Sequence, residues 1–116
     1  MTRTWLVAGA AVATVLQGCG GHSCSSVGRF GLSVRVQDSR GAAVCEAVVS
    51  ATDGDYSEVL SAGTANDCVF IGALERRGTY TVTATLGGIT GSISGVKVRA
   101  DVCHVITQVV TVKLGA

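Results

Sequence analysis

Residues 74–86, LERRGTYTVTATL, decide the fold because they join a turn to a long alternating segment. Charged residues and Gly78 interrupt the apolar run before it, which is typical of a turn. Beyond the turn, Tyr80, Val82 and Ala84 alternate with four threonines. Apolar residues at a period of two indicate a strand with one face in the core, and Val and Thr suit a pleated surface. We expect residues 79–85 to form a half-buried strand.

The same period of two recurs in shorter segments on both sides of this strand. The alternating apolar sets are Leu32, Val34 and Val36; Ala47, Val49 and Ala51; Tyr56 to Leu60; Val69 and Ile71 before Leu74; Val96 and Val98; and Val110, Val112 and Leu114. Turns rich in Gly and Asp separate them, and no stretch keeps a helical period over ten residues. Seven short strands of this kind predict an all-β protein, an antiparallel β-sandwich.

Length and charge limit what this sandwich can do. The chain has 116 residues, enough for one domain once a targeting segment is set aside. Nine Lys and Arg face eight Asp and Glu, so no basic field attracts nucleic acid, and we expect no nucleic-acid partner. Few large aromatic side chains are available for the core, and a small domain with a light core usually needs a covalent link.

The N-terminal segment has the form of an export signal. Residues 1–4 carry one positive charge, and residues 5–16 are apolar or small apart from Thr14. A membrane-spanning helix would need about 20 apolar residues, more than this run contains. Two cleavage points are open. One follows the A-x-A pattern of residues 11–13, which would leave only residues 5–10 as the apolar segment, and the other precedes Cys19.

The tetrapeptide Leu16-Gln17-Gly18-Cys19 resembles the lipobox of bacterial lipoproteins. In that family the cysteine thiol carries a diacylglycerol, the chain is cut before the cysteine, and the new amine is usually acylated, commonly with palmitate. Gln17 departs from the small or apolar residue common at its position. The resemblance implies a lipoprotein signal peptide over residues 1–18, lipidation of Cys19, and attachment to a membrane through lipid.

The number of cysteines agrees with lipidation. The chain contains Cys19, Cys24, Cys45, Cys68 and Cys103, and an odd number leaves one thiol to explain in an exported protein. If Cys19 carries lipid, four cysteines remain, and an oxidising compartment favours disulfide bonds between them. Four cysteines permit three pairings. Residues 19–29, which include GGHSCSSVG, are rich in Gly and Ser and indicate a flexible tether.

Three stretches together resemble the carboxypeptidase regulatory-like domain, a transthyretin-like seven-stranded Greek-key sandwich. They are SVRVQDSRGAAVCEAVVSATDG, DCVFIGALERRGTYTVTATLGG and VKVRADVCHVITQVVTVKL. The matching positions are Asp38, Gly41, Val44 and Ala47 in the first, and Leu74, Gly78 and Tyr80 in the second. The family often has Pro in both turns, whereas this chain has Ala43 and Arg76-Arg77. The resemblance implies such a domain over residues 30–116.

The resemblance also implies a disulfide pairing. In transthyretin-like sandwiches the first and last strands run parallel and side by side, which would bring Cys24 near Cys103. A middle strand pairs antiparallel with the first, which would bring Cys68 near Cys45. We therefore expect the bonds Cys24 to Cys103 and Cys45 to Cys68.

Metal binding is the main alternative for the cysteines. His22 and Cys24 with Cys103 and His104 offer ligands that suit a tetrahedral metal such as zinc. The spacings C-x-x-C and H-x-x-x-H are absent, so we expect a disulfide with exposed histidines, no metal and no cofactor. Asp53-Gly54-Asp55 offers two carboxylates to calcium, but other oxygen ligands have no identifiable source, and we expect a turn with solvated acids.

No catalytic residue is expected. The two histidines accompany no recognisable nucleophile motif, and no phosphate-binding loop precedes a helix. In carboxypeptidases the resembling module accompanies the catalytic domain and carries none of its zinc ligands. The chain is thus expected not to be an enzyme.

The expected function is a lipid-anchored, non-catalytic structural or interaction module of the bacterial cell envelope, with a protein or glycan partner. The alternative is an envelope protein that binds a small ligand or glycan, which a pocket lined by Tyr56 and Tyr80 together would favour. Gly20 is not the Asp that retains many lipoproteins at the inner membrane of enteric bacteria. An outer-membrane location is therefore preferred if the host is Gram-negative.

Overall fold

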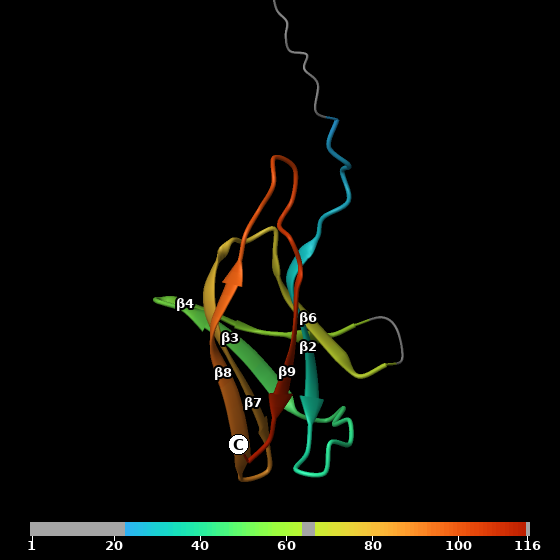
Figure 1. The fold of residues 1–116 in the computed structure, drawn as a ribbon, viewed down its shortest axis with the longest axis vertical. Coiled ribbons are helices and arrows are strands. Elements are labelled where there is room, and N and C mark those ends of the chain that lie inside the picture. Colours follow the sequence, from blue (N-terminus) through green and yellow to red (C-terminus); the bar gives the residue numbers. More distant parts are fainter. Residues whose placement is uncertain (1–22, 64–66, 116) are drawn as a thin grey trace, which may run out of the picture.

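The structure is a computed structural model that describes residues 23–63 and 67–115, and these residues form two facing β-sheets without a helix (Figure 1). The strands are β2 (Phe30–Gln37), β3 (Val48–Asp53), β4 (Tyr56–Val59), β5 (Ser61–Ala62), β6 (Val69–Leu74), β7 (Gly78–Leu86), β8 (Ile89–Val98) and β9 (Gln108–Lys113). The prediction of an all-β sandwich is confirmed.

Each sheet has four strands. One sheet has the order β5-β6-β2-β9 and the other β4-β3-β7-β8. Strand β2 runs antiparallel to β6 and parallel to β9, with pairs that extend from Leu32 and Gln108 to Gln37 and Lys113. All other neighbouring strands are antiparallel. The first and last described strands therefore lie side by side and point in one direction.

The described residues contain eight strands where the sequence predicted seven, because the strand predicted over residues 56–60 is divided. Leu60 is 4% exposed, and its N–H donates to the carbonyl of Val49 at 2.8 Å. Before Leu60, β4 pairs with β3, whereas after it β5 pairs with β6 of the other sheet. Residues 56–62, YSEVLSA, contain no Gly or Pro that would mark this crossing, so the sequence gives no sign of it.

The core lies between the sheets and contains most of the predicted alternating residues. The set predicted in β6 is wrong: Phe70 is buried, whereas Val69 and Ile71 are only half-buried and Leu74 is 56% exposed. The continuous apolar run Val69-Phe70-Ile71 hides which residues face inward. Tyr80, Val82 and Ala84 of β7 are 0% exposed, so the half-buried strand is confirmed. Burying a side chain such as Val or Leu stabilises the fold by about 1.5 to 3 kcal/mol. The other buried apolar residues are Leu32, Val34, Val36, Val44, Ala47, Val49, Ala51, Leu60, Phe70, Ala73, Val96, Val98, Val105, Val112 and Leu114.

Strand β8 is longer than the two-residue alternation at Val96 and Val98 indicated. Its register with β7 changes between the pairs Val82 with Ile93 and Tyr80 with Val96, which marks a β-bulge. Gly95 lies in this bulge with a φ of 71°. Because the bulge shifts the inward face from odd to even positions, Gly91 is buried before it and Val96 after it.

The turn before β7 is fixed by a side chain. The buried Tyr80 hydroxyl donates to the carbonyl of Arg76 at 2.9 Å, four residues upstream. This contact is a tyrosine corner, a device of Greek-key sandwiches in which a tyrosine near the start of a strand bonds back to the preceding backbone. Non-glycine residues with positive φ occur here, at Ala73 and Glu75, so the tyrosine holds a backbone that most residues disfavour.

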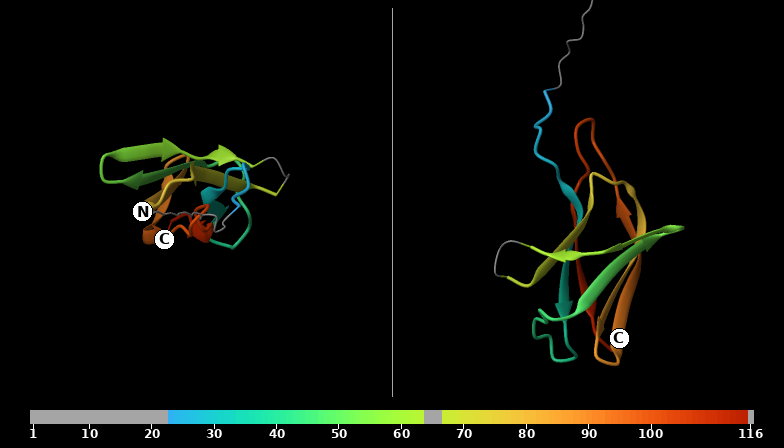
Figure 2. Two further views of the ribbon diagram at one scale, coloured as in Figure 1. Left: turned by 90° about the horizontal axis from the view of Figure 1, so that it is seen from above. Right: turned by 180° about the vertical axis from the view of Figure 1, so that it is seen from behind.

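One end of the sandwich receives the N-terminal segment. Residues 23–29, the turn at 75–77 and the hairpin at 99–107 lie together there, and we call it the tether end (Figures 1 and 2). The C-terminus and the turns at 38–47 and 87–88 lie at the opposite end. The predicted signal peptide and Cys19 fall outside the described residues. In the part of the chain that the structure describes, no helix is long and apolar enough to cross a bilayer.

Candidate functional site

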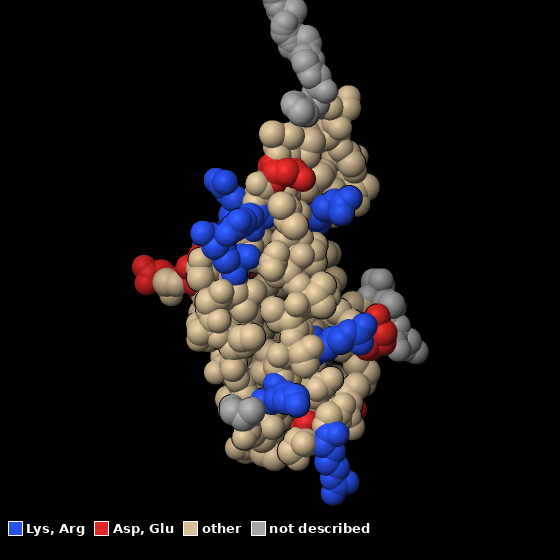
Figure 3. Space-filling view, in the orientation of Figure 1, with Lys and Arg blue, Asp and Glu red and all other residues tan. Residues whose placement is uncertain are grey.

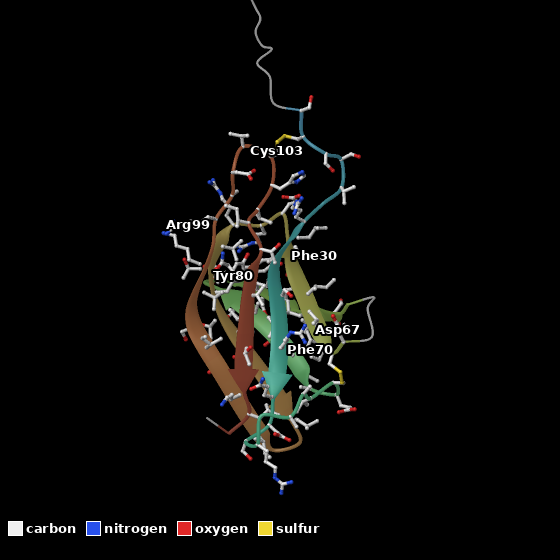
Figure 4. The ribbon with its side chains drawn as sticks, turned by 45° about the vertical axis from the view of Figure 1, so that its right-hand side comes forward. Phe30, Asp67, Phe70, Tyr80, Arg99 and Cys103 are labelled. Atoms are coloured by element: carbon white, nitrogen blue, oxygen red, sulfur yellow. A yellow bond between two sulfur atoms is a disulfide. The ribbon has the colours of Figure 1, made fainter. Side chains whose placement is uncertain are left out.

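Two disulfide bonds link distant parts of the chain. Cys24 is bonded to Cys103 with Cα atoms 5.3 Å apart, and Cys45 to Cys68 with Cα atoms 4.7 Å apart (Figure 4). The pairing equals the one that the transthyretin-like resemblance implies. Sulfur atoms in disulfides cannot act as thiolate ligands, and His22 lies outside the described residues. The prediction of an exposed histidine is wrong for His104, whose side chain is only 15% exposed because it packs against the Glu75 carboxylate. Among residues 23–63 and 67–115, no three His, Cys, Asp or Glu side chains are grouped to hold a metal.

Glu75 joins three segments of the tether end. Its carboxylate accepts the backbone N–H groups of Arg29 at 2.9 Å and Val105 at 3.1 Å, and it contacts Nδ1 of His104 at 2.5 Å. The hydrogen bond from His104, followed by that from Arg29, lowers the pKa of Glu75 below its ordinary value. The ionised carboxylate only accepts, so Nδ1 carries the proton. Glu75 thus fixes the 99–107 hairpin against the start of β2.

Asp101 closes the tip of the same hairpin. Its carboxylate accepts the backbone N–H groups of Cys103 at 2.8 Å and His104 at 2.9 Å. These bonds, that from His104 first, lower the pKa of Asp101. The base of the hairpin is held by the N–H of Ile106, which donates to the carbonyl of Arg99 at 2.7 Å. Both carboxylates of the tether end therefore satisfy donors within the fold.

The tether end also carries a group of cations. Thr79 of β7 pairs with Lys97 of β8, and Gly78 pairs with Val98. Arg77 and Arg99 lie just beyond the last of these pairs, next to Gly78 and Val98, and they line one groove together with Lys97. All three cations are exposed, and in the described residues none of them forms an ion pair. We call Arg77, Lys97 and Arg99 the cationic patch; blue side chains gather at this end in Figure 3.

Two shallow grooves surround this patch. One of about 450 Å³ is lined by Arg77, Gly78, Thr79, Lys97, Val98, Arg99 and Ala100. A second of about 400 Å³ is lined by Gly95, Lys97, Arg99, Ile106 and Gln108. In Figure 4 the Arg99 side chain extends away from the ribbon toward solvent. Because the sequence is almost neutral overall, composition gave no sign of the patch. The alternation of Val96, Lys97, Val98 and Arg99 could have shown that Lys97 and Arg99 share a face.

Tyr56 and Tyr80 come together, but around a side chain of the protein itself. Their ring centroids are 6.3 Å apart, and Cζ of Arg76 lies 3.7 Å from the Tyr56 centroid. Arg76 also bonds Asp53 at 3.1 Å, so the Asp of the predicted turn is paired rather than solvated. Cζ of Arg76 also lies 5.6 Å from the Tyr80 centroid, so both rings pack around this guanidinium, and neither tyrosine lines the two grooves described above.

Glu58 completes the same cluster. Its Oε1 accepts the Tyr56 hydroxyl at 2.6 Å and the N–H of Ala73 at 2.9 Å. The bond to Glu58 raises the pKa of Tyr56, and the bonds to Tyr80 and Asp53 raise that of Arg76. All these groups are satisfied by one another, as expected of a structural network.

The chain matches no family model, and no similar curated protein or solved structure was found. Function is therefore inferred from the residues and from the geometry of the tether end.

Proposed function

We propose that this protein is a bacterial cell-envelope lipoprotein whose sandwich is a non-catalytic structural or interaction module. Residues 1–18 are the signal peptide, Cys19 carries lipid, and residues 20–29 form the tether. The observation that carries the proposal is the Cys24–Cys103 bond. It fastens the chain, five residues after Cys19, to the hairpin that Glu75 and Asp101 hold rigid.

The lipid anchor fixes which end of the sandwich lies near the membrane. Five residues span at most about 18 Å when fully extended, so the tether end stays near the bilayer. Acyl chains contribute about 0.8 kcal/mol per buried methylene, and two or more chains give stable attachment. The opposite end, with the turns at 38–47 and 87–88, then faces away from the membrane. Loops on a rigid scaffold are the usual place for recognition, and these turns are where a protein or glycan partner would bind.

Three features support a domain of the carboxypeptidase regulatory-like, transthyretin-like class over residues 30–116. The parallel pairing of β2 with β9 is the relation expected of its first and last strands. The two disulfides match its geometry. The tyrosine corner of Tyr80 belongs to Greek-key sandwiches. If β4 and β5 are counted as one strand that changes sheet, the count is seven.

Metabolic labelling with a clickable palmitate analogue in the native host tests the anchor. The wild-type protein should take up label, and a Cys19→Ser variant should take up none. The matched control is the double variant C24S/C103S, which loses two other cysteines and should keep the label. An unlabelled wild-type protein, or a labelled Cys19→Ser variant, would contradict lipidation at this residue.

A Gly20→Asp variant tests the location in a Gram-negative host. The wild-type protein should fractionate with the outer membrane. The variant, which carries the residue typical of inner-membrane lipoproteins, should move to the inner membrane while keeping its label. Wild-type protein found in the inner membrane would overturn the outer-membrane assignment and leave lipidation intact.

A further inference from the structure

The tether end exposes apolar side chains at its extremity. Val102, at the tip of the 99–107 hairpin, is 73% exposed, and Val27, on the segment beside it, is 71% exposed. Ile106, at the base of the hairpin and in the wall of the second groove, is 48% exposed. Single exposed apolar residues are common on protein surfaces, so their meaning depends on what surrounds them.

Positively charged side chains surround these exposed apolar residues. Arg29 and the cationic patch supply four positive side chains at this end, and the carboxylates there are those of Glu75 and Asp101. Those two carboxylates already accept hydrogen bonds from backbone N–H groups and from His104. The cations are free of ion pairs among the described residues. Four cations against two carboxylates leave this end with a net positive charge around an apolar tip.

Arg77, Lys97 and Arg99 lie together in the lining of one groove of about 450 Å³. Like charges held close together repel each other, which makes this grouping unfavourable in the isolated fold. An anionic surface brought against the groove would be attracted to all three side chains and would offset their mutual repulsion. Phosphate groups of lipids are such anions, and basic residues close to a bilayer are attracted to anionic leaflets.

We propose that the tether end docks directly on an anionic phospholipid surface, with Val102 and Val27 entering the interface and the cationic patch contacting lipid phosphates. This inference rests on the proposed function, because the lipid on Cys19 is what brings this end to the bilayer. Chain length agrees with it: the at most about 18 Å between Cys19 and Cys24 leaves little room for the hairpin to stand clear of the headgroups. The sandwich is held upright on the membrane, and its opposite end projects outward.

Tryptophan fluorescence gives the test, because the only natural tryptophan, Trp5, lies in the signal peptide. The lipidated mature V102W variant is reconstituted in vesicles of brominated phosphatidylcholine, with or without phosphatidylglycerol. Bromine on the acyl chains quenches a tryptophan that enters the bilayer. We expect strong quenching with phosphatidylglycerol, little without it, and loss of quenching at high salt, which screens exposed charges. The control I89W, in the turn region at the opposite end, should stay unquenched in both.

Charge variants identify the contacts. R77Q/K97Q/R99Q placed in the V102W background should abolish the quenching. The matched triple R35Q/R40Q/K113Q removes the same charge elsewhere on the sandwich and should retain it. Equal loss in both triples would show an effect of net charge alone and would overturn the assignment to this patch.

Vesicle flotation separates the two proposals. Protein that floats with the vesicles, while V102W remains unquenched or is quenched equally without phosphatidylglycerol, overturns the docking and leaves the lipid anchor intact. Protein purified from the native host that does not float overturns the anchor, and the docking with it.

Discussion

The Tyr80 hydroxyl in β7 forms two hydrogen bonds with Arg76 in the preceding turn, one with its backbone carbonyl and one with its guanidinium. The hydroxyl donates to the Arg76 carbonyl at 2.9 Å and accepts from Arg76 Nη1 at 3.0 Å. Tyr80 is 0% exposed, and the same guanidinium bonds Asp53 at 3.1 Å. The Arg76 side chain, in the turn at the tether end, therefore links the buried Tyr80 to Asp53 at the end of β3.

Replacing Tyr80 with Phe should destabilise the fold by about 1 to 3 kcal/mol, because the Arg76 carbonyl and guanidinium lose a buried partner. Urea denaturation of the wild type and the variant measures the difference in the free energy of unfolding. Y56F is the matched control. It removes a hydroxyl from a half-buried ring of the same cluster and should cost less. Equal losses for the two variants would show that the corner has no special role.

The two disulfides should differ in their contributions to stability. Cys24 and Cys103 are 79 residues apart in sequence, and Cys45 and Cys68 are 23 apart. Closing the longer loop removes more entropy from the unfolded chain, so we expect about 4.5 kcal/mol for Cys24–Cys103 and about 3.4 kcal/mol for Cys45–Cys68. Thermal unfolding of C24A/C103A and of C45A/C68A compares them. A larger loss in the second pair would contradict the unfolded-state explanation.

Gly91 is required by the close approach of β8 to β9. A Cβ atom at this position would overlap the backbone carbonyl of Lys113, which cannot move without breaking the pairing of β9 with β2. We therefore expect G91A to lower the free energy of unfolding by about 1 to 3 kcal/mol. G88A, three residues earlier in open space, serves as the control and should leave stability nearly unchanged. A neutral G91A would show that the sheets have room to separate here.

Acid should loosen the tether end. The pKa of Glu75 is lowered in the folded protein, so its contribution to stability is fully present above its ordinary value of 4.5 and is lost as the pH falls through the lowered pKa. The melting temperature of the wild type should fall with pH below 4.5. E75Q should start lower at neutral pH and fall less steeply. The control E46Q changes an exposed glutamate and should keep the wild-type dependence of melting temperature on pH. If E46Q reduced this dependence as much as E75Q does, the attribution of the effect to Glu75 would be refuted.

The fold class could be predicted because the period of two reports directly which side chains face the core. Residues 79–85 satisfied it fully and form β7 as predicted. Three features could not be predicted from this alternation. The bulge at Gly95 changes the inward parity of β8. The chain passes from one sheet to the other at Leu60, where no Gly or Pro marks the crossing. In β6 a continuous apolar run hides which residues face inward, and Phe70 is buried rather than Val69 and Ile71.

The candidate site was less predictable, because it depends on which strands pair. Arg77 and Arg99 are far apart in sequence, and the pairing of β7 with β8 brings both of them into the lining of one groove. The tertiary bonds of Glu75 likewise join residues that no local pattern connects. The cysteines were different, since their odd number and the resemblance of residues 16–19 to a lipobox predict a separate role for Cys19, and the structure shows the other four paired.

The proposed lipoprotein architecture is tested by intact mass spectrometry of the mature protein from its native host, with and without reduction. We expect a chain that starts at Cys19, carries the mass of acyl chains, and gains the mass of four hydrogen atoms on reduction as the bonds Cys24–Cys103 and Cys45–Cys68 open. A chain that starts at Thr14 without acyl mass would contradict it.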